Sequence, residues 1–164
     1  MTTSTDSVRV TTVVAVDPPT AFEIFTADVD AWWKYGPRFR TGRRGESEMR
    51  FEPGVGGRLV EVFDENADPF VLGRITSWEP PTGLAFEMGG RDFRPGETTW
   101  VDVRFEPVEA GTRVTVEHRG WDAFPEDHPV RHGLGAGGAF TSMMSVFWAD
   151  LLSAHRMRVE QEES

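Results

Sequence analysis

The strongest constraint on the fold is an alternating pattern over residues 97–108 and 111–121. In "ETTWVDVRFEPV" and "GTRVTVEHRGW", valines and phenylalanine alternate with charged residues and threonine. This period of two is typical of strands with one buried and one solvated face. The pair predicts a β-hairpin around Glu109-Ala110-Gly111, and therefore a sheet with one dry face.

Further elements are predicted on both sides of this hairpin. The first segment, "VRVTTVVAV", is rich in β-branched residues and indicates a strand, and a run of short segments separated by Gly and Pro indicates four more. Two prolines at the start of "PPTAFEIFT" favour the first turn of a helix, and Asp28 is expected to cap a second short helix. The predicted strands are 8–16, 47–54, 56–64, 70–81 and 83–90, and the predicted helices are 18–26 and 28–35.

The C-terminal segment predicts one long amphipathic helix beginning near residue 139. Its apolar residues recur at spacings of three and four, namely Phe140, Met143, Met144, Phe147, Trp148, Leu151 and Leu152. We expect residues 1–7 to form a disordered tail, 8–158 a single domain, and 159–164 a frayed end. Helices segregated from a run of antiparallel strands predict an α+β architecture.

Composition excludes several classes of protein. The 164 residues include no cysteine, so neither a disulfide framework nor a thiolate nucleophile is available. The net charge of −10 opposes binding to nucleic acid or to an anionic membrane surface. No run approaches the roughly 20 apolar residues of a membrane span, and the polar start "MTTSTDS" differs from a secretory signal, so we expect a cytoplasmic location.

The stretch "DVDAWWKYGPRF" places Trp32 directly beside Trp33. Neighbouring residues of a helix point about 100° apart, so the two indoles cannot share one narrow face. We expect one ring in the core and the other near a second surface, such as a cavity entrance.

Four segments together resemble the SRPBCC (START/Bet v 1-like) superfamily. They are "VAVDPPTAFEIFTADVDAWWKYGPRF", "FEPGVGGRLVEV", "LGRITSWEPPTGLAFEM" and "TTWVDVRFEPVEAGTRVTVEHRGW", and they cover most of residues 8–121. The chain is most similar to the AHSA1-like branch, named after the activator of Hsp90 ATPase. The resemblance implies the helix-grip fold, in which a curved antiparallel sheet holds a C-terminal helix and a hydrophobic pocket lies between them.

Strand alternation and the helical stripe direct one set of side chains toward that interior. Mostly apolar walls describe a small-molecule site, and they equally describe a filled core. The resemblance favours the pocket. The predicted lining residues are Trp32, Trp33, Phe51, Leu59, Phe86, Met88, Val101, Val103, Phe105, Val116, His118, Met143, Met144, Phe147, Trp148 and Leu151.

His118 and Glu61 are the candidates for chemistry. His118 has the same parity as Val114 and Val116, so it faces the dry side, where it could orient a ligand or transfer a proton. A histidine hydrogen-bonded at the edge of the core is the competing interpretation. Glu61 shares its direction with Leu59, and we hypothesise a buried pair with His118, although a register shift of one residue would place Glu61 in water.

Three further motifs have simpler interpretations. His128 and His132 have the spacing of helical metal ligands, but Pro129 and the lack of a third ligand favour a loop or the start of a helix, so we expect no metal. "GLGAGG" satisfies a dinucleotide-binding pattern without the strand that must precede it, so we expect a hinge and no cofactor. The cluster Arg38, Arg40, Arg43 and Arg44 is expected to be a solvated loop.

We therefore expect a protein that binds a small apolar or aromatic molecule. The alternatives are an enzyme of the polyketide cyclase or hydratase type, for which polar groups would converge around His118, Glu61 and Arg74, and an interaction protein with an Hsp90-like partner. An isologous homodimer is a general expectation that no residue demands.

Overall fold

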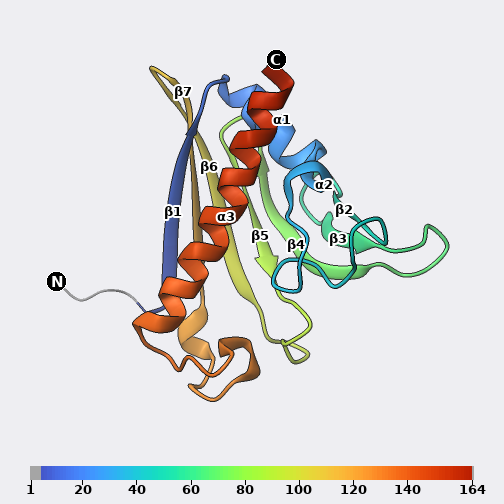
Figure 1. Ribbon diagram of the computed structural model, residues 1–164, viewed down its shortest axis with the longest axis vertical. Coiled ribbons are helices and arrows are strands. Elements are labelled where there is room, and N and C mark those ends of the chain that lie inside the picture. Colours follow the sequence, from blue (N-terminus) through green and yellow to red (C-terminus); the bar gives the residue numbers. More distant parts are fainter. Residues whose placement is uncertain (1–4, 164) are drawn as a thin grey trace.

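The computed structural model, which describes residues 5–163, shows an α+β fold with one curved sheet packed against a long helix (Figure 1). The predicted fold class is confirmed. Seven antiparallel strands lie in the order β1-β7-β6-β5-β4-β3-β2. The elements are β1 (Ser7–Val14), α1 (Pro18–Ala27), α2 (Val29–Trp32), β2 (Glu48–Phe51), β3 (Arg58–Val62), β4 (Phe70–Glu79), β5 (Gly83–Met88), β6 (Thr99–Val108), β7 (Gly111–Arg119), the short 3₁₀ helices η1 (Trp121–Ala123) and η2 (Pro129–Arg131), and α3 (Gly138–Glu163).

The predicted hairpin forms the second and third strands of the sheet, next to β1. Val103 lies opposite Val116, and the last pair, Val108 with Gly111, leaves a turn of two residues. Gly111 has a φ of +140°, and a Cβ there would lie 2.1 Å from the carbonyl oxygen of Val14. Glycine is therefore required where β1 crosses the end of the hairpin.

Two irregularities bend the other half of the sheet. The register shifts between Leu59 and Val60 in β3, and again between Ile75 and Ser77 in β4. Bulges of this kind increase the local twist and bend of a strand. Figure 1 shows β2, β3 and β4 turned away from the direction of β6 and β7, which creates the concave face that α3 covers.

The two helices that follow β1 begin as predicted but differ in length. Asp17 caps α1 by accepting a hydrogen bond from the backbone N–H of Thr20 at 3.1 Å. The second helix is shorter than the predicted 28–35, and Asp28 makes no side-chain capping bond. The chain leaves the helix at Trp33, whose indole N–H reaches the carbonyl of Phe39, 3.0 Å away.

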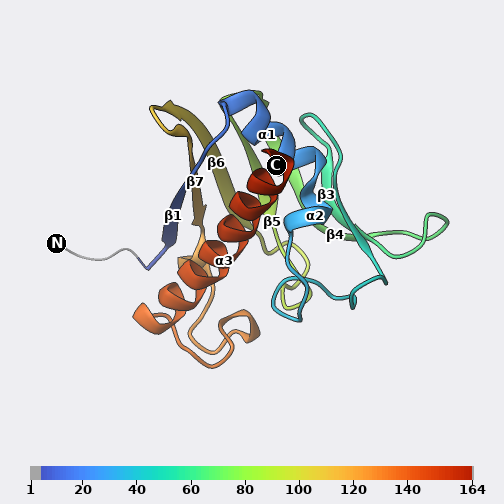
Figure 2. The same ribbon diagram turned by 45° about the horizontal axis from the view of Figure 1, so that its top comes forward.

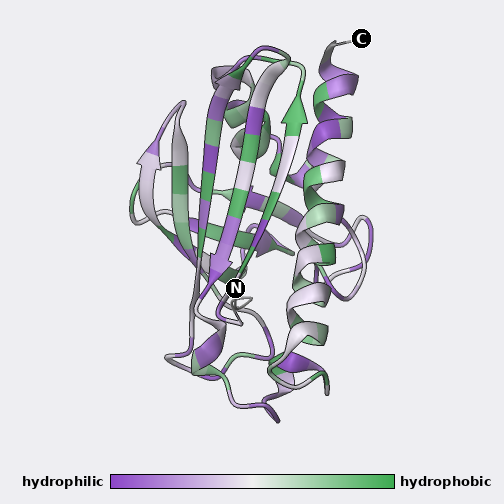
Figure 3. Ribbon diagram, turned by 90° about the vertical axis from the view of Figure 1, so that its left-hand side faces the viewer, coloured by the Kyte–Doolittle hydropathy of each residue, from purple (hydrophilic) through white to green (hydrophobic). Residues whose placement is uncertain are grey.

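The core lies between the sheet and α3 and extends along the helix from Phe140 to Val159. Figure 3 shows the apolar side of this helix directed at the sheet. Phe25 contacts Phe105 and Phe51, and Trp148 and Leu151 are fully buried.

The helix continues to Glu163 with Val159 fully buried, so 159–163 is helical where fraying was expected. Ser7, expected in the N-terminal tail, begins β1, and residues 1–4 of that tail lie outside the described residues.

Candidate functional site

A pocket of about 460 Å³ lies at the end of the sheet near the N-terminus of α3. Three loops, 36–41, 89–98 and 120–137, gather at that end (Figure 2). The walls are mostly apolar. The lining residues are Pro37, Arg38, Phe39, Arg40, Thr41, Glu61, Phe70, Leu72, Met88, Gly89, Gly90, Arg91, Asp92, Phe93, His118, Trp121, Val130, His132, Met143, Met144 and Phe147.

Five predicted pocket residues line this pocket, namely Met88, His118, Met143, Met144 and Phe147, and Glu61 joins them. The other predicted residues are buried in the core beside it: Trp32, Trp33, Phe51, Leu59, Phe86, Val101, Val103, Phe105, Val116, Trp148 and Leu151. Aromatic rings among them pack edge to face, with Phe105 against Phe22 and Phe25 of α1 and Phe51 against Phe86 within the sheet. Both tryptophans of the pair are therefore core residues.

Most of the loop residues in the pocket wall were not predicted from the sequence. Phe39, Phe93 and Trp121 lie in loops or just beyond a strand, where no period directs a side chain inward. A signal was present, because "GGRDF" places an aromatic residue in a glycine-containing connection. Binding residues are found disproportionately in loops held by a rigid scaffold.

His118 is held at the base of the pocket by a chain of hydrogen bonds. The indole N–H of Trp148 donates to Nδ1 at 3.0 Å, and Nε2 lies 2.6 Å from the Thr99 hydroxyl. That hydroxyl donates its own proton to the carbonyl of Met88 at 2.7 Å, so Nε2 must carry the imidazole proton. Burial lowers the pKa of His118 to about 3. The neutral ring thus connects α3, β7, β6 and β5, and both nitrogens are occupied.

Glu61 is bound by the loop that precedes β2. Oε1 accepts from the backbone N–H and hydroxyl of Thr41 at 3.0 and 2.8 Å, and Oε2 accepts from Gly42 N–H at 2.9 Å and the Ser47 hydroxyl at 2.5 Å. Burial raises the pKa of this carboxyl, but the hydrogen bonds from Ser47, Thr41 and Gly42 together have a larger effect in the opposite direction. The net result is a pKa lower than the ordinary value of a glutamate. The hypothesised pair with His118 is wrong, because each side chain is saturated by other partners.

Replacing Glu61 by Gln is expected to lower the free energy of unfolding by about 2 kcal/mol. Each carboxylate oxygen of Glu61 accepts two hydrogen bonds from the loop, one of them from a backbone N–H. In either orientation of the glutamine amide, its NH₂ group takes the place of one of these oxygens and faces the donors of Thr41 or those of Gly42 and Ser47. Urea unfolding measures the change, with Glu109→Gln in the exposed hairpin turn as the matched control. Equal stability of the two variants would contradict the assignment of Glu61 as the anchor of this loop.

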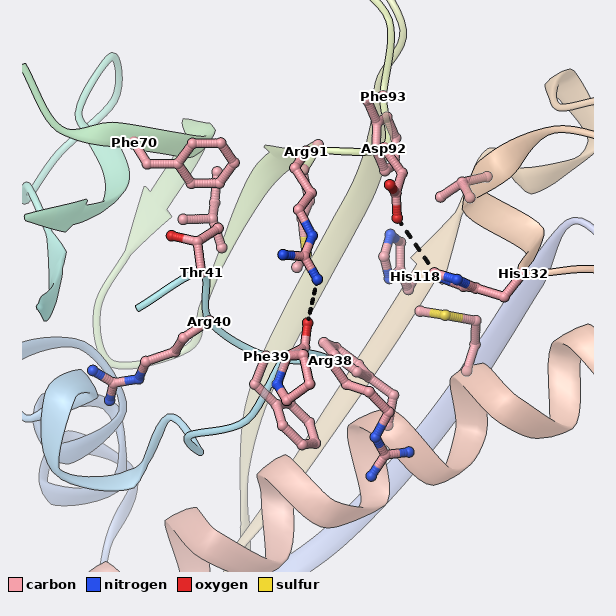
Figure 4. A pocket seen from close by; sticks show the side chains of 18 of the residues that line it. Arg38, Phe39, Arg40, Thr41, Phe70, Arg91, Asp92, Phe93, His118 and His132 are labelled. Atoms are coloured by element: carbon pink, nitrogen blue, oxygen red, sulfur yellow. Dashed lines mark hydrogen bonds and ion pairs between the residues drawn. The ribbon is translucent and has the colours of Figure 1, made fainter. Parts of the chain in front are cut away.

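The arginine cluster differs from the solvated loop that was expected. Arg40 is 3% exposed, forms an ion pair with Asp30 at 2.7 Å and donates to the carbonyl of Trp33. Figure 4 shows its side chain pointing away from the other labelled residues. Its burial is possible because carbonyl and carboxylate oxygens surround the guanidinium. The remaining members, Arg38, Arg43 and Arg44, are exposed as predicted.

The two histidines of "HPVRH" have separate structural roles. His128 Nδ1 accepts from the backbone N–H of Val130 at 3.0 Å at the start of η2, and its Nε2 lies 2.9 Å from Glu97. His132 Nε2 lies 3.7 Å from Asp92 across the pocket rim (Figure 4).

Within residues 5–163, no three His, Cys, Asp or Glu side chains are grouped so as to hold a metal ion. In the same described part, no helix is long and apolar enough to cross a membrane.

A curved seven-stranded sheet around a C-terminal helix, with a pocket at one end, defines a helix-grip protein. Residues 15–147 match the family model described as "Activator of Hsp90 ATPase homolog 1-like protein". The chain belongs to this family. A search of curated proteins gave no significant match.

Solved structures with the same fold cover nearly the whole chain. An HSP90 activator from Plasmodium falciparum has a TM-score of 0.65 and 18% identity, covering 94% of this chain and 96% of its own. A protein of unknown function from Staphylococcus aureus has a TM-score of 0.64 and 14% identity, with coverages of 96% and 94%. The AHSA1-like protein from Aeromonas hydrophila has a TM-score of 0.61 and 18% identity, with coverages of 96% and 94%. At these identities the similarity establishes the fold alone.

Proposed function

We propose that this protein binds a small, largely apolar or aromatic molecule in the pocket between the sheet and the first turns of α3. The single observation that carries the proposal is the mostly apolar pocket of about 460 Å³. Small-molecule sites have volumes of roughly 300–1,000 Å³ and combine apolar walls with a few polar groups. Here Met143 and Met144 supply adaptable side chains, and Phe70, Leu72 and Phe147 complete the apolar walls.

The enzyme alternative needed polar groups converging on His118, Glu61 and Arg74. Arg74 donates to the carbonyl of Gly56 at 3.2 Å and is absent from the lining residues. His118 and Glu61 have all their polar atoms engaged within the protein. A general acid or base must reach its substrate with an available proton or lone pair, so this set does not support catalysis.

Interaction with an Hsp90 chaperone is the second candidate function. The family description and the printed name of the Plasmodium falciparum relative favour it. Affinity capture with a purified bacterial or eukaryotic Hsp90 distinguishes the two candidates, because small-molecule binding needs no such partner.

N-phenyl-1-naphthylamine, an uncharged fluorescent probe, tests small-molecule binding. We expect its emission to rise on titration into the protein, and Met143→Trp to weaken its binding at least about tenfold by filling the pocket. The matched control is Val146→Trp, on the exposed side of the same helix and 51% exposed. Absence of probe binding to the unmodified protein, or equal weakening by both variants, would overturn the proposal.

A further inference from the structure

One polar side chain on the pocket wall retains most of its hydrogen-bonding capacity. Of the three arginines that line the pocket, Arg40 is paired with Asp30, and Arg38 lies 3.2 Å from Asp150. Arg91 donates one hydrogen bond, to the carbonyl of Pro37 at 3.1 Å, and forms no ion pair within residues 5–163. A guanidinium carries five N–H groups, so Arg91 can still bind an acceptor with two oxygens.

The acidic groups of the same wall have other partners. Glu61 accepts four hydrogen bonds from Thr41, Gly42 and Ser47. Asp92 faces His132 on the other side of its loop. In Figure 4 the side chain of Arg91 extends between Phe70 and His118, with its guanidinium directed toward the 37–39 segment. The pocket therefore combines apolar walls with one available cation at its exposed rim.

We propose that the pocket selects an apolar or aromatic carboxylic acid, whose carboxylate binds Arg91 while its body lies against Met88, Phe93 and Phe147. This inference rests on the proposed function of the same pocket. An arginine and a carboxylate form two parallel charge-assisted hydrogen bonds, which are stronger than neutral ones. In the contact with Pro37 the donor is charged but the acceptor is a neutral carbonyl, so a ligand can replace this bond without leaving a buried charge. Because the whole chain carries a charge of −10, the attraction is local to Arg91.

A matched pair of competitors tests the charge while the apolar body stays constant. At pH 8, 1-naphthylacetic acid is ionised and 1-naphthylacetamide is neutral, and each displaces N-phenyl-1-naphthylamine if it enters the pocket. We expect the acid to compete about tenfold better than the amide, and this preference to shrink as salt is added. Arg91→Met should abolish the preference, whereas Arg94→Met should retain it, because Arg94 is exposed in the same loop and does not line the pocket.

The outcomes separate this inference from the proposed function. If the probe binds and acid and amide compete equally, pocket binding stands and selection of a carboxylate is overturned. Stronger competition by 1-naphthylmethylamine, the cationic analogue, would also overturn it. If the probe does not bind at all, both proposals fail. The acid-to-amide ratio of the unmodified protein decides whether a carboxylate is selected even if Arg91→Met does not fold, and loss of the ratio in Arg94→Met would overturn the assignment to Arg91.

Discussion

Lowering the pH from 7 to about 4.5 is expected to reduce the free energy of unfolding by about 5 kcal/mol. Burial lowers the pKa of His118 to about 3. Burial lowers the pKa of His155 to about 4, although its hydrogen bond to the carbonyl of Ala21 acts in the opposite direction. Both groups titrate near 6.5 when unfolded. At a pH between the folded and unfolded pKa values, the unfolded chain binds more protons than the folded chain. The free energy of unfolding therefore decreases by about 1.4 kcal/mol for each histidine with every pH unit of acidification in that range.

Urea unfolding measured at a series of pH values checks this expectation. The lowered pKa of Glu61 adds stability that is complete above about 4.5 and is lost as pH falls through its folded value, so it steepens the curve only at the acid end. A stability that stays constant between pH 7 and 5 would contradict the prediction. It would mean that His118 and His155 are protonated in the folded protein.

His155→Leu separates the contribution of one histidine. The imidazole packs against Phe25 and Trp32, Nε2 lies 3.2 Å from the carbonyl of Ala21, and Nδ1 has no partner within the described part of the chain. Leucine loses one hydrogen bond but removes a buried unsatisfied nitrogen, so we expect a change of less than about 1 kcal/mol at pH 8. At pH 5 the variant should be about 2 kcal/mol more stable than the unmodified protein. Parallel curves for the two proteins would exclude titration of His155 as a cause.

Replacing Arg131 by Met is expected to cost about 4 kcal/mol of stability. This side chain is 1% exposed, and its Nη2 donates to the carbonyls of Trp121 and Phe124 at 2.6 and 2.8 Å. Nε donates to Pro125 at 3.1 Å and Nη1 to Gly135 at 3.3 Å. Methionine would leave the carbonyls of Trp121 and Phe124 without this donor in a buried position. The same change should weaken probe binding, because the segment that Arg131 organises carries the pocket residues Trp121, Val130 and His132.

Arg94→Met is the matched control for this substitution. Arg94 is exposed in the loop between β5 and β6, so its loss should change stability by less than about 0.5 kcal/mol. Arg131→Lys keeps the charge with fewer and differently directed donors and should fall between the other two. If Arg131→Met were no less stable than Arg94→Met, the carbonyl cluster would not depend on this guanidinium.

The periodic elements could be predicted because their pattern repeats along the chain. Alternation placed Val114, Val116 and His118 on the buried face, and the same parity placed Glu61 inward, where it is 1% exposed. Parity states which face a side chain occupies, but it says nothing about partners across that face. His118 therefore bonds to Thr99 and Trp148 rather than to Glu61, because β3 and β7 are separated by three strands.

The position of the pocket could not be predicted in the same way. The predicted lining included Phe105, Trp148 and Leu151, which have the right parity and spacing but are buried in the core, where Phe105 packs against Phe25 and Trp148 against Trp33. Whether a concave interior is filled depends on the volumes of rings contributed by distant segments, which close packing decides jointly. Loop residues such as Phe39 and Phe93 have no period, so only their final positions make them walls.

By itself, then, the order of alternating strands and one amphipathic helix determined the helix-grip architecture and its dry face, since local geometry requires only the chain's own periodicity. The tertiary structure alone decided where space is left, which buried polar atoms are already occupied, and that Arg91 is the available cation of the pocket. Those properties arise from contacts between segments far apart in the chain, and no short stretch of sequence contains them.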